Sequence, residues 1–130
     1  MSPAGSYESL MAAIQAGAGS VYFGVGVLNM RSRSAANFTL EDLQQITDIC
    51  HEHHVNSYLT VNTIVYNDEI EKAHELLDVA KRCQVTAIIA SDMAVIQYAR
   101  QIGLEVHLST QCNVTNVEAV RYYAQFADVI

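Results

Sequence analysis

This sequence of 130 residues has no tryptophan, a single proline and only seven basic side chains against fourteen acidic ones. The resulting net charge of -7 disfavours a nucleic-acid surface, because phosphate binding requires clustered Lys and Arg. No apolar run approaches the length of a membrane span, and the N-terminus lacks the basic and apolar regions of a signal peptide. We therefore expect a cytoplasmic chain with no membrane association.

Cysteine is also scarce. Cys50, Cys83 and Cys112 are odd in number and widely spaced, which favours reduced thiols over a disulfide framework. Cys50 and Cys83 fall on the apolar faces of predicted helices, so we expect both in the core.

Helical and strand-like patterns alternate along the chain. Typical N-cap residues precede five apolar patterns with helical spacing, and Asp68 is followed by Glu71 at the spacing of a capping box. The last helix is expected to bury Val117, Val120 and Ala124. The five predicted caps are Ser6, Thr39, Asp68, Asp92 and Asn116, and the strand-like runs cover residues 21–25, 57–61, 86–90, 105–108 and 128–130.

Strict alternation of helix and strand predicts an α/β fold with a parallel sheet and right-handed crossovers. Either an open doubly wound sheet or a TIM-type (β/α)₈ barrel has this order. A complete barrel takes about 250 residues, so residues 1–130 would form a single truncated barrel domain, about the first half to two-thirds. Its cut edges would expose unpaired backbone groups, which predicts a homo-oligomer.

Polar residues follow several of the predicted strands. Because parallel strands point the same way, their carboxyl ends would gather at one edge, where both architectures bind ligands. Capping of the next helix is the favoured interpretation for Ser6, Ser91 and Asp92. Helix capping is a weaker explanation for polar residues that lie several positions before the next predicted cap. These residues are Asn62, Thr63, Gln111 and Asn113.

Two sets of residues suggest chemistry but have simpler interpretations. The run His51-Glu52-His53-His54 has Val55 where a metalloprotease helix needs its second histidine, so imidazoles at a helix C-terminus are favoured and no metal site is assigned. Cys112 lies five residues after His107, and a nucleophile would need that imidazole within hydrogen-bond reach. A structural thiol is the favoured interpretation of Cys112.

Arg31 and Arg33 follow the glycine turn after the second strand. Two guanidinium groups at the mouth of a pocket could bind a carboxylate or a phosphate. The alternative, a solvated loop that pairs with local acidic residues, stays open.

Four segments in order resemble the start of the peptidase U32 family, the collagenase-like proteases. They are SPAGSYESLMAAIQAGAGSVYFG, MRSRSAANFTLEDL, VNSYLTVNTIVYNDE and HLSTQCNVTNVEAV. The resemblance runs from Ser2 to Ile130. It implies a TIM-type barrel, of which this chain would cover the first loop through the sixth strand.

The same resemblance implies two activities. Some members are proteases, including collagenases, and others hydroxylate a base in transfer or ribosomal RNA or act in quinone synthesis. The partner would accordingly be a peptide or an RNA, and a third interpretation is a non-catalytic packing fragment. Several members use an iron–sulfur cluster held by cysteines downstream of this segment, so no cofactor is expected within residues 1–130.

Family motif positions single out Asn62, Thr63, Asp68, Gln111 and Asn113 as substrate-binding residues. Arg31, Arg33 and Cys112 complete the predicted set. No residue is assigned a catalytic step.

Overall fold

The computed structural model describes residues 1–26 and 38–130. Its sheet has five parallel strands in the sequential order β1-β2-β3-β4-β5. The strands are β1 (Ser2–Pro3), β2 (Ser20–Gly24), β3 (Asn56–Val61), β4 (Ala87–Ala90) and β5 (Val106–Leu108). The α-helices are α1 (Tyr7–Gln15), α2 (Asp42–Glu52), α3 (Ile70–Cys83), α4 (Met93–Gln101) and α5 (Val117–Tyr123), with short 3₁₀ turns η1 (Asn67–Glu69) and η2 (Thr110–Cys112).

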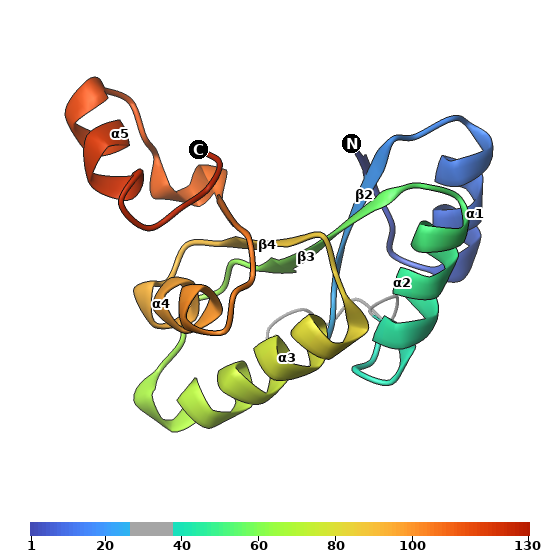
Figure 1. The fold of residues 1–130 in the computed structure, drawn as a ribbon, viewed down its shortest axis with the longest axis horizontal. Helices are drawn as coiled ribbons and strands as arrows, with labels where there is room; N and C mark the ends of the chain where they lie inside the picture. Colours follow the sequence, from blue (N-terminus) through green and yellow to red (C-terminus); the bar gives the residue numbers. More distant parts are fainter. Residues whose placement is uncertain (27–37) are drawn as a thin grey trace.

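The helices α1 to α4 cover one side of the sheet. In Figure 1 they surround β3 and β4 from the right and from below, whereas both chain ends lie above β3 and β4. Each strand pairs in parallel with the next strand in the sequence, as in a (β/α) barrel. The predicted α/β architecture with parallel strands and crossover helices is confirmed.

Alternation along the strands separates two faces of the sheet. In β3, Ser57, Leu59 and Val61 are buried, whereas Tyr58 and Thr60 between them are half-buried. The buried apolar set of the strands belongs to one core with residues of the covering helices, such as Leu10, Leu43, Ile46, Leu77 and Ile96. The half-buried set forms the inner wall of the curved sheet, which none of α1 to α4 covers.

Two predicted helix starts are wrong. Thr39 does not cap α2, which begins at Asp42; instead the Asp42 carboxylate accepts bonds from the Thr39 N–H at 2.8 Å and from its hydroxyl at 3.0 Å. Asp68 forms no capping box with Glu71, because η1 precedes α3 and Glu69 takes the pairing role. The Glu69 carboxylate accepts from the Tyr66 N–H at 3.2 Å.

The other three predicted caps are confirmed. The side chains of Ser6, Asp92 and Asn116 accept from backbone N–H groups in the first turns of α1, α4 and α5. Gly17 and Gly103 follow the C-termini of α1 and α4 with φ angles of 86° and 82°, a conformation that glycine adopts without steric cost.

Helix α5 differs from its predicted packing. None of its residues is buried, and Val117 and Val120 are 58% and 40% exposed. The spacing of these valines is helical, as predicted, but no element of the described chain covers the face that carries them. Beyond α5, Val129 forms an isolated parallel bridge with His107, which begins the pairing expected for residues 128–130.

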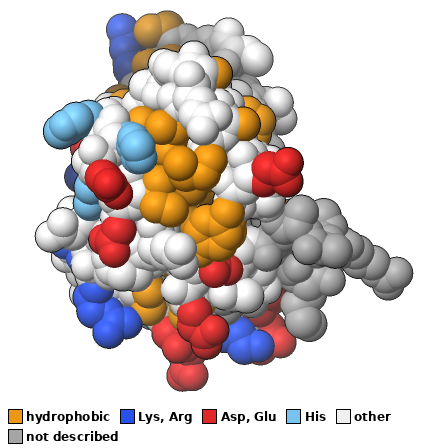
Figure 2. Space-filling model, turned by 90° about the vertical axis from the view of Figure 1, so that its right-hand side faces the viewer, with side chains coloured by type: hydrophobic (Ala, Val, Ile, Leu, Met, Phe, Trp, Pro, Cys, Tyr) orange, Lys and Arg blue, Asp and Glu red, His pale blue; other side chains and the backbone are white. Residues whose placement is uncertain are grey.

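The outer surface of α1 and α2 is mixed in character. Figure 2 views the molecule from this side and shows apolar side chains gathered beside histidines and acidic groups. Tyr7, Ile14 and Ile49 are partly buried apolar residues of these two helices. In the ranges 1–26 and 38–130, no helix combines the length and the apolar character needed to cross a bilayer.

Candidate functional site

Strand register brings the polar strand ends together. Thr60, Ile89 and His107 lie in one row across β3, β4 and β5. Two positions further along each strand come Asn62, Ser91 and Ser109, which therefore emerge at the same carboxyl edge. We call the set Asn62, Ser91, Ser109 and Cys112 the polar rim.

Hydrogen bonds connect the members of the polar rim. The Ser91 hydroxyl donates to the Asn62 carbonyl oxygen at 3.2 Å, and the Cys112 thiol lies 3.9 Å from the Ser91 carbonyl oxygen. The Ser109 N–H donates to the Ala90 carbonyl oxygen at 2.8 Å. The predicted capping role of Ser91 is therefore wrong, because its side chain joins two strand ends and Asp92 alone caps α4.

Asp92 also fixes the loop beside the rim. One carboxylate oxygen accepts from the Ala94 N–H at 2.8 Å, and the other accepts from the Val65 N–H at 3.1 Å. Both carboxylate oxygens therefore act as acceptors of backbone N–H groups. One residue therefore anchors the start of α4 and the loop between β3 and α3.

The predicted binding residues differ in burial and in the element that carries them. Asn62 and Thr63 are half-buried at the end of β3, whereas Gln111 and Asn113 are exposed in and just after η2. Asp68 is exposed on η1, which leads into α3. Arg31 and Arg33 lie outside the described residues.

The η2 turn has a defined backbone. The Ser109 hydroxyl accepts from the Gln111 N–H at 3.2 Å, and Asn113 has a φ angle of 49°. Asparagine tolerates this left-handed conformation better than most residues. The turn directs the chain from β5 toward α5 and leaves the amide side chains of Gln111 and Asn113 at the surface.

Cys112 is associated with Tyr123 rather than with a histidine. The pKa of Tyr123 is raised, first by the charge that Cys112 carries once it ionises, then by desolvation and a hydrogen bond with the same thiol. His107 instead contacts Glu105 and Tyr58. The described contacts therefore do not include the thiol–imidazole pair that a cysteine nucleophile would use.

A group on the inner wall was not predicted as a site. The His107 Nε2 atom lies 2.7 Å from the Glu105 carboxylate, and the imidazole ring lies 4.9 Å from the Tyr58 ring. Ala87 on β4 is the register partner of Tyr58 on β3, and its small side chain leaves room for the tyrosine ring to reach across β4 to His107. The alternation of Glu105 and His107 with buried Val106 was the available sequence signal.

The remaining histidines and cysteines do not form a metal centre. His51, His53 and His54 are exposed at the C-terminal end of α2, as expected, and no group of three metal-ligating side chains occurs within residues 1–26 and 38–130. Cys50 and Cys83 are buried on α2 and α3, apart from Cys112 on η2. These three thiols therefore do not suit an iron–sulfur cluster, which needs its cysteines together.

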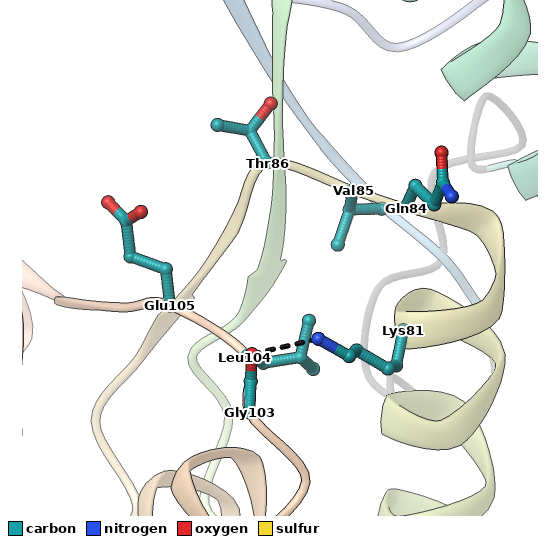
Figure 3. A pocket seen from close by; sticks show the side chains of 7 residues that line it. All are labelled: Lys81, Gln84, Val85, Thr86, Gly103, Leu104 and Glu105. Carbon is teal, nitrogen blue, oxygen red and sulfur yellow. Dashed lines mark hydrogen bonds between the residues drawn. The ribbon is translucent and has the colours of Figure 1, made fainter.

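A pocket of about 380 Å³ lies at the opposite, amino end of β4 and β5. Figure 3 shows the Lys81 ammonium reaching the Gly103 carbonyl oxygen, at 3.0 Å, while Glu105 and Thr86 point to another side. The two charged groups of the lining already have partners, since Glu105 pairs with His107. In barrels this end serves stability, so the polar rim is the better candidate. The lining residues are Lys81, Gln84, Val85, Thr86, Gly103, Leu104 and Glu105.

Comparison with solved structures supports the barrel. The chain superposes on the U32 peptidase Mk0906 with a TM-score of 0.76 and 13% sequence identity, covering 97% of this chain and 54% of that one. At this level of identity the match shows a shared fold.

Relatives in sequence are closer. The chain is 59% identical over its whole length to a protein named collagenase from Porphyromonas gingivalis, and 30% identical over 127 residues to tRNA hydroxylation protein P1 of Bacillus subtilis. It spans 31% and 30% of the lengths of these two relatives. The model of peptidase family U32 matches residues 5–128. The chain belongs to peptidase family U32.

Proposed function

We propose that this chain supplies the N-terminal part of the barrel of a U32 peptidase and that its polar rim binds the polypeptide substrate. The observation that carries the proposal is the contact of Ser91 with the Asn62 carbonyl, which unites two strand ends at the carboxyl edge. The 59% identity with a protein named collagenase supports a peptide substrate.

The available groups suit a peptide backbone. An extended peptide presents N–H donors and C=O acceptors that must be paired when they leave water. The amides of Asn62, Gln111 and Asn113 offer both donors and acceptors, and the Thr63 hydroxyl can do the same. In this proposal the polar rim and the neighbouring side chains of Thr63, Gln111 and Asn113 bind and orient the substrate, and the bond-breaking group lies elsewhere in the parent protein.

A chimera tests the proposal. Residues 1–130 replace the matching segment of the Porphyromonas collagenase, and hydrolysis of denatured collagen is measured. Asn62→Ala should reduce kcat/KM by about tenfold or more, the equivalent of one or two hydrogen bonds. Asn56→Ala is the matched control, because Asn56 is exposed at the amino end of the same strand.

The outcomes separate the interpretations. A substrate site at the rim is contradicted if Asn62→Ala and Asn56→Ala lose the same kcat/KM, or if neither variant loses any. An active chimera that is indifferent to every rim substitution supports a packing fragment instead.

RNA-base hydroxylation is the second candidate. It is supported by the 30% identity with a tRNA hydroxylation protein over 96% of this chain. The net charge of -7 opposes it, because an RNA substrate requires positive charge from elsewhere in the protein. Mass spectrometry of nucleosides from a deletion strain tests this candidate, since the strain should then lack one hydroxylated base.

A further inference from the structure

We propose that His107 is a ligand-binding residue whose Nδ1 atom accepts a hydrogen bond from an N–H or O–H group of the bound substrate. The proposal rests on the substrate site proposed above and extends it from the polar rim down the inner wall. It concerns a side chain that the rim does not include.

Position is the first argument. His107 precedes the rim residue Ser109 by two positions, so both side chains leave β5 on the same face. That face is the inner wall, where His107 lies in the same row as Thr60 and Ile89. Its side chain is 18% exposed, so it is held in place but still accessible. A substrate group that enters below the rim would meet this ring.

Orientation is the second argument. The Glu105 carboxylate lies 2.7 Å from Nε2. An ionised carboxylate has no proton to donate and can only accept, so the proton of this hydrogen bond is on Nε2. In the neutral ring the other nitrogen, Nδ1, is then an acceptor. Glu105 therefore acts as a positioning residue that selects the tautomer. Contact with Tyr58, at 4.9 Å between ring centroids, restricts rotation of the imidazole.

Available partners are the third argument. Within residues 1–26 and 38–130, the only side-chain hydrogen bond of His107 is the one to Glu105. Its backbone does belong to the sheet, where it pairs with Ile89 and Val129. The Nε2 atom of the imidazole is thus held by Glu105, and the Nδ1 atom is available to a ligand. A purely structural histidine would need only the Nε2 contact.

Two substitutions distinguish the two nitrogens. Asparagine places its amide near the position of Nδ1, whereas glutamine reaches the position of Nε2. In the chimera, His107→Asn should retain most of the activity and His107→Gln should lose about tenfold in kcat/KM. The reverse order would show that only the Glu105 contact matters and would overturn the proposal. His51→Gln, at an exposed histidine on α2, is the matched control.

A spectroscopic measurement gives an answer that does not depend on activity. In the chain labelled with ¹⁵N-histidine, the neutral His107 ring should show a protonated Nε2 and an unprotonated Nδ1, and Glu105→Ala should mix the tautomers. A neutral ring protonated at Nδ1 would overturn the proposal. If Asn62→Ala reduces activity but both His107 variants remain active, the rim proposal stands and the His107 proposal fails. If no rim variant has an effect, the proposed function itself fails.

Discussion

The Thr60 hydroxyl crowds the position that a side chain on Gly24 would take. Its hydroxyl donates to the Phe23 carbonyl oxygen at 3.0 Å, and a Cβ atom on Gly24 would lie 3.2 Å from that hydroxyl oxygen. Gly24 and Thr60 are register partners on β2 and β3. The glycine therefore permits close packing of the inner wall just below the carboxyl edge.

Gly24→Ala should consequently destabilise the fold by roughly 1 to 3 kcal/mol, the usual cost of overpacking. Urea unfolding followed by circular dichroism would measure it. Gly19→Ala is the control, because nothing lies within 4 Å of its added Cβ, and it should be neutral or stabilising. A double variant with Thr60→Ala should recover part of the loss. Equal effects at Gly19 and Gly24 would refute the packing argument.

Asp92→Ala should cost about 2 kcal/mol, because it removes a helix cap and the bond to the Val65 N–H together. Asp68→Ala is the matched control and should change stability little, since Asp68 is exposed and forms no capping box. Both can be compared by urea unfolding at neutral pH. A larger loss at Asp68 than at Asp92 would show that the described caps are assigned wrongly.

These two aspartates also show how far the sequence could be interpreted. Both precede apolar residues at helical spacing, and local sequence cannot distinguish a cap from the first turn of a 3₁₀ segment. The alternation of helix and strand depends on periodicity alone, so the parallel sheet was predictable. The gathering of polar strand ends followed from the direction of parallel strands.

Contacts between strands were not predictable in the same way. The pairing of Ser91 with the Asn62 carbonyl, and the reach of Tyr58 to His107, depend on register and on the size of an intervening residue. Exposure of Val120 depends on what lies beside α5, which the local pattern does not contain. The sequence therefore predicted the edge of the candidate site but not the inner wall below it.

Acid stability should depend on Asp42. Hydrogen bonds from the Thr39 backbone and then from Tyr7 lower the pKa of this carboxyl below its ordinary value of 3.8. The folded state thus favours the carboxylate, which contributes stability above about pH 4 that is lost as the pH falls through the lowered pKa. Asp42→Asn should flatten this loss when urea unfolding is measured between about pH 2 and pH 5. An unchanged pH profile would contradict the assigned contacts.

Tyr7 should titrate late in the folded protein. Desolvation, followed by the hydrogen bond to Asp42, raises its pKa from 10.0 to about 12. The neutral phenol is favoured on folding, so its contribution is complete below pH 10 and is lost as the pH rises toward 12. Ultraviolet titration should therefore show a late tyrosine that is absent in Tyr7→Phe. Exposed Tyr66 offers a control through Tyr66→Phe, which should leave the late step in place.

Thiol reactivity should separate the three cysteines. Burial raises the pKa of Cys50 to about 11 and also raises that of Cys83, so both hold little of the reactive thiolate near pH 8. Cys112 is half-buried at the rim and should react first with iodoacetamide. Peptide mass spectrometry gives the order. Rapid labelling of Cys50 in the native protein would contradict its place in the core, whereas labelling after urea unfolding should reach all three.

Finally, we propose that the 130-residue chain self-associates when it is produced alone. Strand β1 pairs only with β2 among the described elements, so its outer edge can pair with another strand. Helix α5 follows β5, the strand at the opposite edge of the sheet, and exposes an apolar stripe formed by Val117 and Val120. A second copy that covers these surfaces would remove both from water.

Light scattering over a range of protein concentrations should therefore show a mass that rises with concentration. The double variant Val117→Lys with Val120→Lys should shift the chain toward a monomer without loss of stability, because neither valine is buried. Ala12→Lys adds a charge at an exposed position of α1 and should leave the association unchanged. A monodisperse monomer at every concentration would contradict the proposal. An oligomer that resists the α5 charges would instead place the contact at the β1 edge or on the inner wall.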